Sequence, residues 1–134
     1  MNKLGNVVLT GWALLTFFLP HSPDMKTDAI SRKLIGHSDV PGTDTEMRMY
    51  LITYPPGASA PPHHHPVVGL GYIVKGKAET QFQGHAPQII SENESFEDLA
   101  VVLHEVFKNL SADQPLVFVI SYVVKKGAPV LETP

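Results

Sequence analysis

The chain has 134 residues, of which 43% are hydrophobic and 17% are charged, and this balance excludes an intrinsically disordered protein. The length fits one domain, because two separate cores would leave each half too small to bury enough surface. The net charge of -3 and the scattered positions of the 10 Lys and Arg residues argue against nucleic acid as a partner, since phosphate binding needs clustered cations.

The N-terminal segment differs in composition from the rest of the chain. Residues 7–19 are almost purely apolar and follow a weakly basic start at Lys3, but they are too few to cross a bilayer, which needs about 20 helical residues. This pattern favours a secretory signal peptide and therefore a secreted or periplasmic protein. The alternative is a strand or helix that packs on a cytoplasmic domain. We expect an apolar leader over residues 1–25 and one domain over residues 26–134.

From Ile30 onward, short apolar runs rich in β-branched and aromatic residues alternate with turn signals made of Pro and Gly. This spacing is typical of an all-β sandwich or small barrel of antiparallel strands. The runs are too short and too often interrupted to keep a helical period. The strands are expected at residues 47–54, 67–74, 78–83, 88–90, 101–107 and 116–124.

Three adjacent histidines, His63, His64 and His65, lie between prolines in the middle of the domain. The prolines disfavour a helix and favour an extended segment. Alternate side chains of an extended segment share a face, so His63 and His65 point to the same side. Two imidazoles in this arrangement can chelate one divalent metal ion. Because the chain has no cysteine, such a site must be completed by nitrogen or oxygen ligands.

A third ligand has to come from elsewhere in the fold, and His104 is the best candidate. It lies in the apolar run of residues 101–107, where an inward-facing imidazole needs a polar partner. Two alternatives remain open. His104 is a core histidine held by a hydrogen bond, or the three adjacent histidines lie on the surface by chance and bind no metal. His37 and His85 lie beside a glycine and in a polar turn, and we expect both to be solvated.

The histidine segment resembles the first motif of the cupins, which runs G-x5-H-x-H-x3,4-E-x6-G. Gly57, His63, His65 and Gly76 reproduce its spacing throughout. The departure is at Gly69, which stands where the family has a glutamate ligand. The resemblance therefore includes two of the histidine ligands of this motif and lacks its carboxylate.

The second cupin motif, G-x5-P-x-G-x2-H-x3-N, is matched at its histidine by His104. Asn93 stands in the place of its opening glycine, and residues 99–101 replace its P-x-G element. A narrower resemblance is to small single-domain cupins of the "cupin 2" conserved-barrel type. Their S-F-x-E element is similar to residues 95–98 here, with Asp98 in the acidic position.

The resemblance implies a single jelly-roll β-barrel with a divalent metal ion inside its mouth, held by His63, His65 and His104. Iron, manganese, nickel, copper and zinc all suit three imidazoles. Without the glutamate, the ion keeps its full double charge, so an anionic ligand should bind more readily. Asp98 and Glu97 are the candidate catalytic carboxylates, as a proton carrier near the mouth, as an oxygen ligand or through a hydrogen bond to a ligating histidine.

We therefore expect a metal-binding cupin that acts as a metalloenzyme of the dioxygenase or related type, with a small-molecule substrate chelating the ion. The alternative is a binding module that holds a small ligand or a metal without turnover. In a third hypothesis the ion only closes the barrel. The family often pairs its barrels, and open sheet edges favour association, so we also expect a homodimer.

Overall fold

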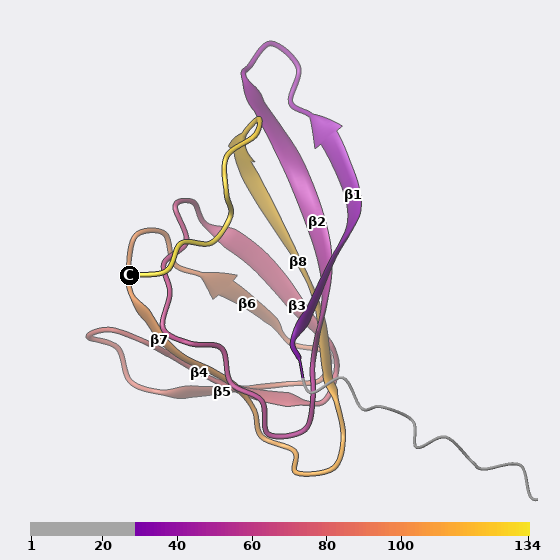
Figure 1. The fold of residues 1–134 in the computed structure, drawn as a ribbon, viewed down its shortest axis with the longest axis vertical. Helices are drawn as coiled ribbons and strands as arrows, with labels where there is room; N and C mark the ends of the chain where they lie inside the picture. Colours follow the sequence, from indigo (N-terminus) through magenta and orange to yellow (C-terminus); the bar gives the residue numbers. More distant parts are fainter. Residues whose placement is uncertain (1–28) are drawn as a thin grey trace, which may run out of the picture.

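The computed structural model describes residues 29–134, so the apolar leader predicted over residues 1–25 lies outside the described part of the chain. Eight strands form in this part, and Figure 1 shows their arrangement. Between residues 29 and 134 there is no helix long and apolar enough to span a membrane. The strands are β1 (Ser31–Asp39), β2 (Thr45–Tyr54), β3 (Gly69–Lys75), β4 (Lys77–Phe82), β5 (Gln88–Ser91), β6 (Ser95–Asp98), β7 (His104–Asn109) and β8 (Leu116–Lys125).

The strands are arranged in two antiparallel sheets. One has five strands in the order β1-β2-β8-β3-β6, and the other has three in the order β5-β4-β7. In each sheet, strands that are distant in the sequence lie side by side, as in a jelly roll, where the chain repeatedly crosses between the two sheets. The expected all-β jelly-roll fold is therefore confirmed.

The sequence predicted six of the eight strands, with boundaries that shift by up to three residues. It missed β1 (Ser31–Asp39) and β6 (Ser95–Asp98). Every residue of β1 is exposed, so this edge strand lacks the apolar alternation that marks a half-buried strand. Strand β6 has only four residues, of which Asp98 is the single fully buried one. Strand β1 is held by pairing with β2, whereas β6 is held by pairing with β3 and by Phe96, which packs on Phe107 and Phe118.

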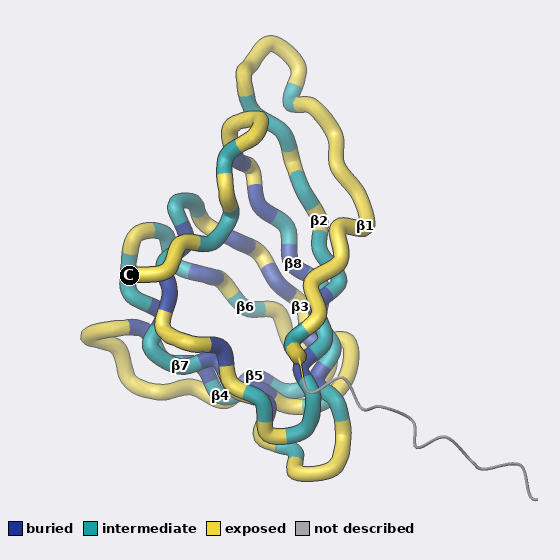
Figure 2. Tube along the Cα trace, in the orientation of Figure 1, coloured by how far each residue is buried: buried dark blue, intermediate teal, exposed yellow. Residues whose placement is uncertain are grey.

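One apolar core fills the space between the sheets, and Figure 2 shows buried positions alternating along β3, β4 and β8. On β8 every second residue from Leu116 to Val124 is buried, which is the period of two that a strand with one face on a core requires. The largest fully buried apolar side chains are Ile73, Leu116 and Ile120. The core therefore lies on the inner face of β8 and of its neighbours.

The outer face of the five-stranded sheet also carries apolar side chains. Met47, Met49, Leu70, Tyr72 and Val123 are all more than two-fifths exposed. Tyr72 lies on this face, where its hydroxyl donates a hydrogen bond to Asn93 Oδ1. The homodimer expected from the sequence stays a prediction.

Two residues with side chains have a positive φ, and both stand where the cupin motif has glycine. Asn93 has φ 69° and Val101 has φ 57°. Asn tolerates the left-handed region, but a β-branched residue there is a genuine outlier. The backbone N–H of Val101 donates to the carbonyl oxygen of His65 at 2.8 Å. The strained turn between β6 and β7 is therefore attached to the histidine segment.

We expect the substitution Val101→Gly to increase the free energy of unfolding by about 0.5–1 kcal/mol. Relief of the left-handed conformation contributes about 1–2 kcal/mol, which exceeds the added chain entropy of glycine of about 0.5–1 kcal/mol. Val101 is 76% exposed, so the loss of its side chain removes little burial. Urea denaturation checks this.

The matched control is Val123→Gly on β8, where the backbone is extended and glycine should lower the free energy of unfolding by about 1 kcal/mol. A Val101→Gly protein that unfolds as easily as the Val123→Gly protein would contradict the interpretation of Val101 as a strained residue.

Candidate metal centre

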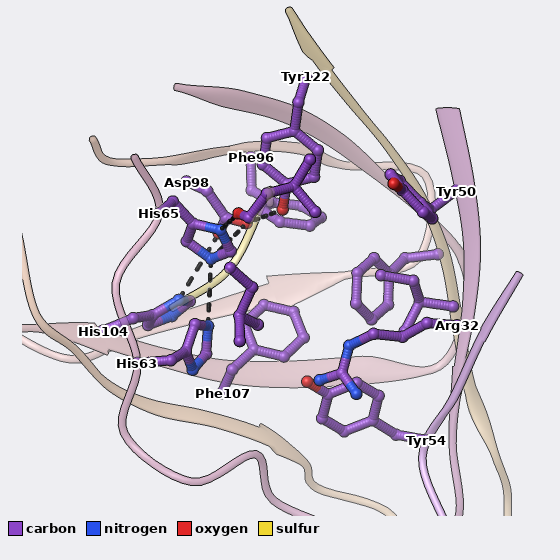
Figure 3. A pocket seen from close by; sticks show the side chains of 14 residues that line it. Arg32, Tyr50, Tyr54, His63, His65, Phe96, Asp98, His104, Phe107 and Tyr122 are labelled. Atoms are coloured by element: carbon purple, nitrogen blue, oxygen red, sulfur yellow. Dashed lines mark hydrogen bonds and ion pairs between the residues drawn. The ribbon is translucent and has the colours of Figure 1, made fainter. Parts of the chain in front are cut away.

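The histidine segment runs as an irregular extended chain inside the barrel mouth. His63 and His65 are buried, whereas His64 between them is half-buried. The backbone of His64 pairs with Glu132 through two hydrogen bonds of 2.8 and 2.9 Å. The two outer histidines thus share the inner face that the period of two predicts. Figure 3 shows both rings directed toward the ring of His104.

His104 is brought to this segment by an isolated antiparallel bridge. The backbones of His63 and His104 exchange hydrogen bonds of 2.8 and 3.2 Å. Because residues that face each other directly in an antiparallel pair present their side chains on the same side, both rings enter one space. The structure therefore brings together the three histidines that the sequence singled out.

The outer nitrogens of His63 and His65 are fixed by backbone carbonyls. His63 Nδ1 lies 2.8 Å from the carbonyl oxygen of Pro61, and His65 Nδ1 lies 2.9 Å from that of Val130. A carbonyl oxygen only accepts, so each Nδ1 carries a proton and donates it. In the neutral rings this leaves a lone pair on both Nε2 atoms, the form in which a histidine binds a metal.

His104 is oriented from the other side of the barrel. Its Nε2 lies 2.7 Å from the hydroxyl oxygen of Thr80 on β4. Its Nδ1 is buried and has no hydrogen-bond partner among the described residues. Burial, reinforced by the neighbouring His63 and His65, lowers the pKa of His104 to about 3. The ring is therefore neutral at ordinary pH, and its Nδ1 receives no hydrogen bond from residues 29–134.

These nitrogens converge on one point. One ligand atom from each of the three histidines lies within 4.8 Å of the others, and the Nε2 atoms of His63 and His65 are 3.1 Å apart. Two nitrogens at about 2.1 Å from a common ion lie about 3–3.5 Å apart at octahedral or tetrahedral angles. Facing lone pairs repel each other unless a proton or a cation lies between them. The donor set and the spacing of the His63–His65 pair therefore fit a divalent metal ion.

A carboxylate faces the same point. Asp98 is buried, with Oδ2 at 3.1 Å from His65 Nε2 and Oδ1 at 3.7 Å from His104 Nδ1. The hydroxyl of Tyr122 donates a hydrogen bond of 2.8 Å to Oδ2. Burial raises the pKa of Asp98, while the nearby His65 and the Tyr122 hydrogen bond oppose that rise. A cation placed beside this carboxyl group would stabilise its ionised form.

The position of Asp98 is related to the missing glutamate at Gly69. The two residues lie directly opposite each other in the pairing of β6 with β3. A Cβ atom at Gly69 would overlap the ring of Tyr122. The tyrosine thus occupies the space beside Gly69, and its hydroxyl reaches Asp98 on the next strand. A carboxylate is present at this end of the cavity, although it comes from a different strand.

The other expected residues lie elsewhere. Glu97 is exposed on the outer face of β6, opposite Leu70, and does not reach the histidines. His37 and His85 are exposed, as expected from the sequence. The catalytic assignments of Glu97 and Asp98 remain predictions, and only Asp98 is placed where it can act with the histidines.

Sequence reasoning missed Arg32, Thr80 and Tyr122. Thr80 and Tyr122 lie in ordinary strand patterns, and nothing in such a pattern indicates that their hydroxyl groups belong to a site. Thr80 contacts His104 and Tyr122 contacts Asp98, and each of these contacts joins strands that are distant in the sequence. The carbonyl of Val130 could not be found from side-chain identity. The segment beyond Lys125, where the sequence predicted neither a strand nor a site residue, contacts His64 and His65 through its backbone.

A cavity of about 50 Å³ adjoins the three histidines, and it holds a few water-sized groups at most. Its walls are mainly aromatic, and Figure 3 shows the three histidines and Asp98 at one end, with Arg32 and Tyr54 at the other. The residues that line it are Arg32, Tyr50, Ile52, Tyr54, His63, His65, Phe96, Asp98, His104, Phe107, Phe118, Tyr122, Val130 and Leu131.

Solved structures similar to this chain include three that illustrate the range of the fold. The DMSP lyase DddQ of Ruegeria pomeroyi is 21% identical, with a TM-score of 0.55 over 65% of this chain and 42% of that one. A cupin superfamily protein of Desulfitobacterium hafniense is 12% identical, with a TM-score of 0.59 over 73% and 80%. An oxalate oxidase solved with the substrate analogue glycolate is 20% identical, with a TM-score of 0.53 over 62% and 44%.

The chain thus spans less than half the length of the lyase and of the oxidase, and these similarities concern the fold. No curated protein sequence matches the chain. The family model described as the cupin domain matches residues 50–123, more than half of the chain and the part that holds all three histidines. With this match added to the two-sheet fold, the chain belongs to the cupin family.

Proposed function

We propose that this cupin is a metal-dependent enzyme of the dioxygenase or related type, acting on a small organic molecule beside one divalent ion. The observation that carries the proposal is the convergence of three buried imidazoles, with the lone pairs of His63 and His65 facing each other at 3.1 Å. A purely structural cluster would satisfy these nitrogens with donors. Here the carbonyl oxygens of Pro61 and Val130 accept from the Nδ1 atoms on the far side of each ring, and the facing Nε2 atoms keep their lone pairs.

Asp98 supplies the negative charge that the three neutral imidazoles lack. Its carboxylate lies between His65 and His104 and is held by Tyr122. One carboxylate reduces the net charge of a divalent centre from two to one and leaves it cationic. Asp98 Oδ1 accepts no hydrogen bond from a described residue, so it also has room to take or return a proton at the cavity.

The bound ion would supply Lewis acidity and, where it is redox-active, electron transfer to or from O₂. The protein side of the chemistry is orientation and exclusion of water. Phe107 and Phe118 form apolar walls close to the histidines, and such walls strengthen electrostatic interactions inside the site. Similar folds belong to an oxalate oxidase and a DMSP lyase, which supports small-molecule chemistry without selecting a reaction.

A non-catalytic binding module is the second candidate, and the small volume of the cavity, about 50 Å³, favours it. The two functions differ in turnover. Consumption of O₂ or of a small chelating acid by the metal-loaded protein supports the enzyme, whereas ligand binding with no chemical change supports the binding module.

The first test is metal content. We expect the protein, purified without an affinity tag, to bind one divalent ion, and His63→Ala and His104→Ala each to weaken binding by more than about 100-fold. Loss of a partner that only supports a ligand already costs about 10–100-fold. Equilibrium dialysis followed by elemental analysis measures this. His85→Ala, at an exposed site, is the matched control, and full metal retention by either of the first two variants defeats the centre.

The second test concerns Asp98. The substitution Asp98→Asn keeps the shape and the acceptor for Tyr122 but removes the charge, so we expect metal affinity to fall by about 10–100-fold. Glu79 lies on the outer face of β4, between the buried residues Ala78 and Thr80. The substitution Glu79→Gln should therefore leave the metal affinity unchanged. Equal affinities for the Asp98→Asn and wild-type proteins would remove the carboxylate from the centre.

The third test concerns the C-terminal segment. Deletion of residues 129–134 removes the carbonyl that fixes His65 Nδ1, and we expect metal affinity to fall by about 10–100-fold. Val130→Ala is the control, because it retains the backbone carbonyl and should bind metal like the wild type. A truncated protein that folds, by circular dichroism, and binds metal at full strength would show that this contact does not orient the histidine.

A further inference from the structure

Arg32 is the cationic side chain that lines the cavity beside the histidines. It lies on β1, directly opposite Ile52 of β2, and Ile52 is buried in the core. Residues opposite each other in an antiparallel pair share a face, so Arg32 lies on the cavity face of β1, although its side chain stays exposed at this edge strand. Figure 3 shows its guanidinium at the end of the cavity away from the three histidines, beside Tyr54.

Within residues 29–134, no carboxylate lies within ion-pair distance of Arg32. The contrast is Arg48, the other arginine of the chain, which is paired with Glu46 at 2.6 Å and donates to the carbonyl oxygen of Ala128. Among the described residues, Asp98 is the only carboxylate in the cavity wall, and its Oδ2 already accepts a hydrogen bond from Tyr122. Arg32 contacts the hydroxyl of Tyr54, but its charge is not neutralised by a described carboxylate and is available to an anion in the cavity.

The charge of Arg32 acts on Tyr54, which lies at the same end of the cavity. Burial raises the pKa of Tyr54 to about 12, and Arg32 opposes this rise. A cation at this end and a divalent ion at the other both attract a negative group placed between them.

Arg32 also lies where the cavity meets the surface. It lines a second hollow with Pro61, His63, Leu131 and Thr133, so it belongs to the mouth and remains partly hydrated. Arg32 and His63 line both hollows, so a ligand in either one lies close to the guanidinium. The arginine is thus placed to select what enters.

We propose that Arg32 binds the carboxylate of a small organic acid whose other end faces the three histidines. The inference rests on the proposed function, because it names the class of substrate for that site. A guanidinium matches a planar carboxylate with two parallel hydrogen bonds. The cavity of about 50 Å³ limits the acid to a few non-hydrogen atoms. A single arginine among apolar walls suits a monovalent carboxylate better than a phosphate dianion, which needs more donors.

The test compares glycolate, a two-carbon acid, with its uncharged amide, glycolamide. Both are titrated into cobalt-loaded protein, and the visible spectrum of the cobalt ion reports binding. We expect Arg32→Gln to weaken glycolate binding by about 10–100-fold, the loss that follows removal of a charge-assisted bidentate pair. Glycolamide binding should change by less than about 3-fold, because the amide carries no charge for the guanidinium to pair with.

Lys33→Gln is the matched control. Lys33 is the next residue on β1 and lies opposite Leu51 on the outer face, so it removes the same charge without touching the cavity. Equal losses of glycolate affinity in Lys33→Gln and Arg32→Gln would mean that the loss follows from the net charge of the protein and not from contact with Arg32. That result would overturn the proposal. So would an equal loss of glycolate and glycolamide in Arg32→Gln, or inorganic phosphate that binds more tightly than glycolate.

The cobalt content separates this proposal from the proposed function. If the wild-type protein binds no cobalt, the metal centre fails, and calorimetric titration of the metal-free protein with glycolate then tests Arg32 alone. Glycolate binding that depends on Arg32 but not on Lys33 supports the carboxylate site in that case. Cobalt binding with no dependence on Arg32 overturns the carboxylate site and leaves the metal centre intact.

Discussion

The reciprocal pair of backbone hydrogen bonds between His63 and His104 is the constraint on which the site depends. It joins an irregular segment with no regular strand partner to the first residue of β7. Backbone pairing fixes the direction of both side chains at once. The His64–Glu132 pairing and the Val101–His65 hydrogen bond then hold the same segment from two other directions. The imidazoles are thus placed by backbone contacts with three separate parts of the chain.

This arrangement explains why a strained residue lies next to the site. Val101 keeps φ 57° because its N–H is held by His65, and the residues on either side lead directly into β7. Strain of this kind persists where the surrounding structure determines the conformation, and it is common near functional sites. Asn93 serves at the other glycine position of the motif with less strain, since asparagine tolerates the left-handed region.

The two ends of the cavity are organised by different means. At the histidine end, Tyr122 lies over Gly69 and donates to Asp98, so the loss of one carboxylate on β3 is accompanied by another on β6. At the mouth, Arg32 is placed by the register of an exposed edge strand, which could accept a new side chain without disturbing the core. The histidines and Asp98 are therefore buried and held by contacts with one another. Arg32, the residue proposed to bind the carboxylate, lies on an exposed strand, where a substitution affects the stability of the fold least.

The sequence by itself determined the two-sheet β fold, the shared face of His63 and His65, and His104 as the third candidate, because these follow from local alternation, turn residues and fixed spacing. Only the tertiary structure decided that Asp98 and not Glu97 faces the histidines, since adjacent residues of a strand point to opposite faces and a strand of four residues gives no pattern that tells which face is inside. Arg32, Tyr122 and the Val130 carbonyl join the site across strands and a terminal segment distant in sequence. Pairing of that kind depends on register and chain path, which no local spacing encodes.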